Sequence, residues 1–184
     1  YLYYTPSTYI SDYQLNATLD STYKNGILDL NLQISSKGNL KKQKQHHTLE
    51  LIVEQGLPST GATDPLQFKK AIYSAKCVTI RDSLTSISWE QLVFQDVPVW
   101  SAETPTLSQI TLNLLDSQGK LIHTLKKQFG FRSVEMKNGF VLINGKPIRF
   151  KGVNRHDHDP YKGHVISKES MLQDVLLMKQ ANMN

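Results

Sequence analysis

Residues 27–34 read Ile27-Leu-Asp-Leu-Asn-Leu-Gln-Ile34, and this stretch decides the fold class. From Leu28 to Ile34 an aliphatic residue recurs at every second position. In an extended chain these side chains share one face, and the polar side chains between them share the other. The turn signal Lys24-Asn25-Gly26 comes directly before the stretch. The pattern predicts a β-strand with one buried face.

Strand patterns continue on both sides of this stretch, and no helical period interrupts them before about residue 131. A one-residue slip in the alternation after Ile10 predicts a β-bulge. Asp116-Ser-Gln-Gly119 predicts a hairpin turn, and residues 56–65, rich in Gly, Pro, Ser and Thr, predict a loop. About seven short antiparallel strands in this span predict a β-sandwich. The other predicted strands are residues 9–19, 48–54, 68–80, 84–94, 108–115 and 120–129.

The formal net charge is +5, and its excess is concentrated in residues 37–47, Lys-Gly-Asn-Leu-Lys-Lys-Gln-Lys-Gln-His-His. A nucleic-acid site would have aromatic or arginine residues among its lysines, and this run has none. We interpret it as the solvated tip of a hairpin and expect no nucleic-acid partner. No apolar run approaches the roughly 20 residues that span a bilayer, so no membrane partner is expected. The single cysteine, Cys77, excludes an intramolecular disulfide.

The pattern changes after residue 133. Two Asn-Gly turn signals bracket Phe140-Val-Leu-Ile143, which predicts a hairpin. Residues 148–153 predict a further short strand. A helix is predicted from about Lys168, with Ser167 as its N-cap. Strand, loop and helix form the opening of a βα unit.

The predicted helix is amphipathic. Its polar residues, among them Gln173, Asp174 and Lys179, are expected to face water. The opposite face is apolar and needs a partner that we expect to lie in further sequence, because both ends of the chain look cut from a longer protein. This apolar face consists of Met171, Leu172, Val175, Leu176 and Met178.

A polar cluster follows the predicted strand and reads Asn154-Arg155-His156-Asp157-His158-Asp159. Polar side chains at the carboxyl end of a strand that precedes a helix are typical of an α/β active site. One alternative is a polar loop whose side chains only cap backbone groups. Another is a metal site on His156 and His158, as in metal-dependent amidohydrolases, with further ligands from later strands.

Residues 139–160, which read Gly-Phe-Val-Leu-Ile-Asn-Gly-Lys-Pro-Ile-Arg-Phe-Lys-Gly-Val-Asn-Arg-His-Asp-His-Asp-Pro, resemble the start of the catalytic barrel of glycoside hydrolase family 2 beta-galactosidases. Residues 171–184 continue the match. Val97-Pro-Val-Trp-Ser-Ala-Glu103 and Phe129-Gly-Phe-Arg132 are similar to landmarks of that family's immunoglobulin-like domain. The resemblance implies an immunoglobulin-like antiparallel β-sandwich over residues 1–133 and the truncated first βα unit of a TIM barrel over residues 134–184.

The resemblance implies that the complete protein is a retaining beta-galactosidase acting on terminal non-reducing β-D-galactosides in carbohydrate catabolism. His156 matches the family histidine that contacts galactose hydroxyls. Asn154 and Arg155 match the same motif and are expected to organise the pocket, with Asp157 supporting them. Asp157 and Asp159 depart from the common His-Glu-His-His form of the motif.

In the family the catalytic Glu pair and the magnesium ligands lie downstream. No catalytic residue, metal ligand or cofactor site is therefore expected in this chain, and the chain alone is predicted to be inactive. Mg²⁺ is expected for the complete enzyme, with Na⁺ as a second candidate ion, and so is a homo-oligomer. The compartment stays open between cytoplasm and periplasm. The alternatives are a stand-alone immunoglobulin-like binding module and another family 2 glycosidase such as a beta-glucuronidase.

Overall fold

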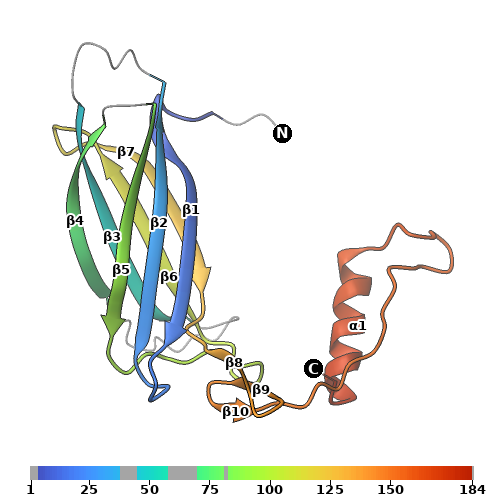
Figure 1. Cartoon of the computed structure of the whole chain (residues 1–184). Coiled ribbons are helices and arrows are strands. Elements are labelled where there is room, and N and C mark those ends of the chain that lie inside the picture. Colours follow the sequence, from blue (N-terminus) through green and yellow to red (C-terminus); the bar gives the residue numbers. More distant parts are fainter. Residues whose placement is uncertain (1–3, 38–44, 58–69, 81–82, 184) are drawn as a thin grey trace. The chain divides into compact units, whose positions relative to one another are not determined.

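The structure is a computed structural model that describes residues 4–37, 45–57, 70–80 and 83–183. Its contacts divide the chain into two compact units, Tyr1–Val134 and Glu135–Asn184. Long strands build the first unit, and the second contains the helix α1, Lys168–Gln180 (Figure 1). Each unit is described by itself below.

The first unit is an antiparallel β-sandwich, as the sequence predicted. One sheet has the strand order β1-β2-β5 and the other has the order β4-β3-β6-β7 (Figure 1). Apolar residues of both sheets join in a single buried core. The strands are β1 Thr8–Leu19, β2 Gly26–Ser36, β3 Gln45–Leu57, β4 Lys70–Ile80, β5 Leu84–Phe94, β6 Leu107–Leu115 and β7 Leu121–Phe129.

The alternating residues of β2 fill this core. Leu28, Leu30 and Ile34 have no exposed surface, whereas Asn31 and Gln33 between them are exposed. Alternating residues of β3 and β6 are buried in the same way from the opposite sheet: Leu49, Leu51, Val53, Ile110, Leu112 and Leu114. Period-two alternation therefore places one face of each sheet against the other.

Two local predictions within the sandwich are confirmed. The pairing of β1 with β2 shifts register between Ile10 and Asp12, which is the predicted bulge. β6 and β7 pair antiparallel, and the turn between them is closed by hydrogen bonds from Asp116 N to Lys120 O, 2.9 Å, and from Gly119 N to Asp116 O, 3.0 Å.

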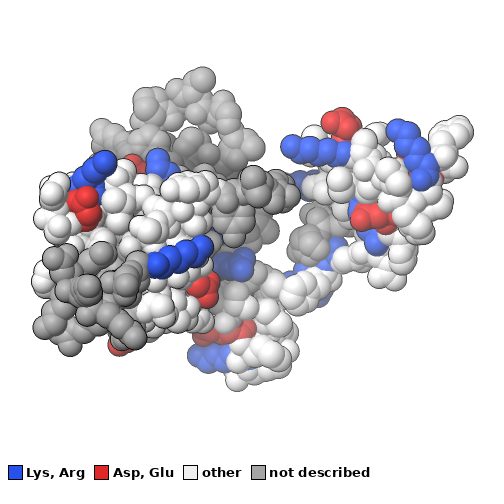
Figure 2. Space-filling view, turned by 90° about the horizontal axis from the view of Figure 1, so that it is seen from above, with Lys and Arg blue, Asp and Glu red and all other residues white. Residues whose placement is uncertain are grey.

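The interpretation of residues 37–47 as a hairpin tip is wrong. β2 and β3, which flank the segment, belong to different sheets, so the segment connects the sheets instead of turning back within one. Residues 38–44 lie outside the described residues, and so does most of the predicted loop 56–65. Figure 2 looks down on one end of the sandwich, and the described Lys and Arg side chains seen there are scattered among acidic and uncharged ones.

A small meander follows the sandwich and lies, apart from its first residue Val134, in the second unit; its strands are β8 Val134–Lys137, β9 Phe140–Ile143 and β10 Lys146–Pro147. Each of its two turns has an Asn followed by a Gly, all with positive φ between 52° and 77°. A type I′ turn requires positive φ at both central residues, which is why the Asn-Gly signal predicted these turns correctly.

The predicted strand over residues 148–153 is not formed in the structure. Residues 148–158 have no regular secondary structure, and Phe150 and Val153 are 70% and 53% exposed. A strand needs a neighbour for its backbone hydrogen bonds, and a barrel strand takes that neighbour from residues far away in the sequence. No such neighbour is found among the described residues.

The helix α1 spans Lys168–Gln180, and Ser167 is its N-cap as predicted, because the Ser170 N–H donates to Ser167 Oγ at 3.2 Å. No residue of α1 is buried, and Leu172, Leu176 and Leu177 are each more than half exposed. Of the helices that the structure describes, none combines the length and the hydrophobicity that a membrane span requires.

Candidate functional site

The predicted polar cluster lies on the loop between β10 and α1, and all six of its residues are exposed or half-buried. Among the described residues, neither the Asn154 side chain nor the His156 imidazole has a hydrogen-bond partner. Both are accordingly accessible to a ligand that approaches this loop.

Arg155 connects the cluster to the helix. Its Nε and Nη2 atoms lie 2.9 Å and 2.8 Å from Asp174 Oδ2, and its Nη1 atom pairs with Asp157 Oδ1. Hydrogen bonds from the guanidinium to Asp157 and Asp174 raise the pKa of Arg155 above its already high value. Asp174 was expected to face water, and its side chain is 44% exposed; its carboxylate also binds Arg155.

Asp159 has a structural role in a turn. Its carboxylate accepts hydrogen bonds from the backbone N–H groups of Tyr161 and Lys162 at 2.8 Å and 3.0 Å, which lower the pKa of Asp159. Its backbone exchanges two hydrogen bonds with Gly163, at 2.7 Å and 2.9 Å. Asp159 therefore caps backbone groups, which is one of the alternatives left open for the cluster.

The two histidines that could share a metal have different surroundings. The ring of His158 packs edge-on against the ring of His164, with centroids 5.8 Å apart, and His164 Nδ1 lies 3.0 Å from the Asp157 carbonyl oxygen. His156 takes no part in this contact. Among the described residues, no three or more His, Cys, Asp or Glu side chains come together as a metal site would require. The described residues therefore offer no three-ligand metal site, and Mg²⁺ in the complete protein stays an expectation.

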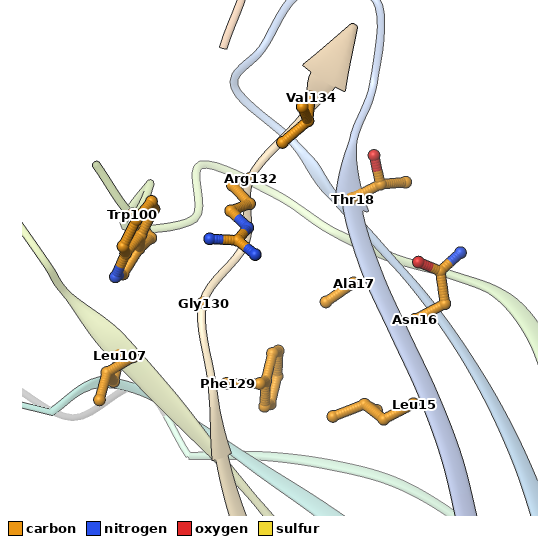
Figure 3. A pocket seen from close by; sticks show the side chains of 10 residues that line it. All are labelled: Leu15, Asn16, Ala17, Thr18, Trp100, Leu107, Phe129, Gly130, Arg132 and Val134. Atoms are coloured by element: carbon orange, nitrogen blue, oxygen red, sulfur yellow. The ribbon is translucent and has the colours of Figure 1, made fainter. Parts of the chain in front are cut away.

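A hollow of about 610 Å³ lies on the sandwich, where Trp100 and Arg132 face residues of β1 (Figure 3). The Arg132 guanidinium lies 4.7 Å from the centre of the Trp100 ring. A Cβ atom at Gly130 would lie 2.7 Å from Trp100 Cβ, so the glycine lets the tryptophan pack closely. The lining contains no Asp, Glu or His and thus offers no general acid or base. It consists of Leu15, Asn16, Ala17, Thr18, Trp100, Leu107, Phe129, Gly130, Arg132 and Val134.

In chain order, the β-sandwich is followed by the three-stranded meander, the loop and the helix α1. The family description "Glycosyl hydrolases family 2" matches residues 8–132, and "Glycosyl hydrolases family 2, TIM barrel domain" matches residues 134–184. The chain belongs to glycosyl hydrolase family 2.

More particularly, several curated relatives that the chain resembles are named beta-galactosidase. The one from Priestia megaterium is 35% identical over 189 residues, which cover 100% of this chain and 17% of the relative. The one from Photobacterium profundum is 34% identical over 179 residues, which cover 97% of this chain and 16% of the relative. The chain thus spans about a sixth of the length of these relatives.

Solved structures with the same fold have other names. A Parabacteroides merdae beta-glucuronidase has a TM-score of 0.68 at 18% identity, covering 97% of this chain and 20% of its own. A beta-galacturonidase from Eisenbergiella tayi bound to galacturonate has a TM-score of 0.76 at 20% identity, covering 98% of this chain and 29% of its own. Likeness at such low identity establishes the fold alone.

Proposed function

We propose that the complete protein is a retaining beta-galactosidase and that this chain supplies its sandwich and one galactose-binding histidine. The observation that supports the proposal most strongly is the identity of 35% and 34% to proteins named beta-galactosidase over nearly the whole chain. A retaining glycosidase uses two carboxyl groups about 5 Å apart, one as nucleophile and one as acid/base. We place both outside this chain.

In this proposal His156 binds the sugar. Its imidazole is exposed and has no protein hydrogen-bond partner among the described residues, so it is available for a galactose hydroxyl group. A hydrogen bond that strengthens as the sugar ring flattens accelerates the reaction, because it stabilises the transition state more than the bound substrate. Asn154, Arg155 and Asp157 would hold the loop in place.

The test is hydrolysis of p-nitrophenyl β-D-galactoside by the complete protein, with the released sugar followed by NMR. We expect β-galactose to form first and to convert to the α-anomer only later by mutarotation. Release of α-galactose first, or no hydrolysis, would count against the proposal. The same assay on the 184-residue chain should give no turnover, since we place the carboxyl pair outside it.

A beta-glucuronidase is the second candidate, because the solved structures with this fold include one under that name. A glucuronide carries a carboxylate, which enzymes commonly bind with a cation. Arg155 is the one Lys or Arg of residues 154–159, and two carboxylates already occupy its guanidinium. This loop therefore supports the neutral galactoside better than a uronide.

A further inference from the structure

We propose that Asp174 is a positioning residue for substrate binding: through Arg155 it holds the loop that carries His156 against the helix α1. The inference rests on the proposed role of His156 and extends it to a residue outside the polar cluster. Asp174 and Arg155 are separated by 19 positions in the sequence.

The contact leaves the guanidinium little freedom. One edge of Arg155 donates through Nε and Nη2 to Asp174 Oδ2 at 2.9 Å and 2.8 Å, and the remaining nitrogen donates to Asp157 Oδ1. Because the guanidinium is planar and its donors have fixed directions, two carboxylates on different sides determine its plane as well as its position.

His156 lies between the two anchored loop residues in the chain. Arg155 is tied to Asp174 by its side chain, and Asp157 is tied to Arg155 by its carboxylate and to His164 through its carbonyl oxygen, 3.0 Å from His164 Nδ1. Anchors on both sides of a residue limit the rotations available to its backbone and so restrict where its imidazole points.

Of the residues that anchor the loop, Asp174 is the one that lies in a helix. It sits within α1, Lys168–Gln180, whose N-terminus is capped by Ser167. A loop without regular secondary structure gains a defined position when it is tied to a helix. Exposed ion pairs contribute little to stability, so losing this pair should alter the site more than it alters unfolding.

The experiment uses the complete protein and Asp174→Asn, which keeps the side-chain shape and removes the charge. Glu169→Gln is the matched control, since Glu169 is the other acidic residue of α1 and does not contact Arg155. With p-nitrophenyl β-D-galactoside, we expect Asp174→Asn to lower kcat/KM by roughly tenfold to a hundredfold, as small misplacements of a binding group do. Asp174→Glu should recover part of the loss, and Glu169→Gln should change kcat/KM less than about twofold.

A second comparison separates positioning from a general structural defect. In a His156→Ala background, Asp174→Asn should lower kcat/KM by less than about threefold, because the group that Asp174 positions is already gone. An equal loss in both backgrounds, or no loss in the wild type, would overturn the proposal.

Hydrogen exchange of residues 153–160 tests the clamp, by which we mean the Asp174–Arg155 contact that holds this loop against α1, without any substrate. Exchange should be faster in Asp174→Asn than in wild type and unchanged in Glu169→Gln. Unchanged exchange in Asp174→Asn overturns the clamp even if the enzyme is a galactosidase. Faster exchange in a protein that cleaves no galactoside supports the clamp and rejects the proposed function alone.

Discussion

The ring of Phe131 lies so close to Gly26 that a Cβ atom at this glycine would come within 2.6 Å of Phe131 Cδ1 and Cε1. Phe131 is fully buried, and its ring centroid lies 5.5 Å from that of Phe94 and 5.1 Å from that of Phe129. Gly26 begins β2, so the aromatic cluster closes one end of the sandwich over the start of that strand. The glycine is required for space, and no positive φ is involved.

Gly26→Ala should therefore destabilise the sandwich by about 1–3 kcal/mol, the usual cost of overpacking a well-filled core. Denaturant unfolding of the 184-residue chain, followed by tryptophan fluorescence, measures this directly, since Trp89 and Trp100 both lie in the sandwich. Gly152→Ala is the control, because nothing lies within 4 Å of its added Cβ. A stability of Gly26→Ala equal to that of the control would show that the ring moves aside freely.

The turn before β2 should make the stability of the sandwich depend on acid pH. Asp20 accepts hydrogen bonds from the Thr22 hydroxyl and from Asn25 Nδ2, both 2.8 Å, and these together with backbone donors lower its pKa to about 2 from 3.8. Because the folded pKa is the lower one, the stabilisation is fully present above the unfolded pKa and is lost as pH falls through the folded pKa.

The stability difference between wild type and Asp20→Asn should therefore shrink between about pH 5 and pH 2. Thr22→Val removes the hydrogen bond that lowers the pKa of Asp20 most, so this pKa should be higher in an NMR titration of the variant. A difference between wild type and Asp20→Asn that stays constant over this range would contradict the role given to the ionised carboxylate.

His156→Ala in the complete protein should lower kcat/KM for a β-galactoside by roughly a hundredfold, the scale of a lost transition-state hydrogen bond. His158→Ala is the comparison, because the ring of His158 packs on His164, 5.8 Å away, instead of being free for substrate. We expect His158→Ala to cost less than about threefold. If the two variants were equally impaired, His156 would have no special role.

Removing both histidines of the cluster should not change the metal content of the complete protein. No three ligands come together among the described residues, and two histidines alone do not complete a zinc site. Mass spectrometry of the purified protein with and without His156→Ala and His158→Ala checks this. Loss of one bound metal ion in the double variant would favour a metal-dependent hydrolase.

Most of the sandwich could be predicted from local pattern. The alternation from Leu28 to Ile34 identified the buried face of β2, and the slip after Ile10 identified the bulge in β1. Both features depend on residues close together in the sequence. The same information cannot show which strands pair, and that is why residues 37–47 were assigned to a hairpin when they connect two sheets.

The candidate site was predictable only in part, for a related reason. The polar cluster and the N-cap Ser167 followed from sequence, but the strand over residues 148–153 depends on neighbours that are not among the described residues. Asp174 was expected to face water, because a helical period shows only that a residue is on the polar side. Its pairing with Arg155 depends on how the loop folds back onto the helix, and a helical period in the sequence does not contain that information.

The central claim is that this chain belongs to an enzyme for neutral β-galactosides, and paired substrates test it most directly. The complete protein is assayed on p-nitrophenyl β-D-galactoside and p-nitrophenyl β-D-glucuronide, which share a leaving group and differ in the sugar. We predict a kcat/KM for the galactoside at least roughly a hundredfold higher, because Arg155 on the loop 154–159 is already paired with two carboxylates and is not free for a uronide carboxylate. An equal or higher kcat/KM for the glucuronide would contradict the proposed function.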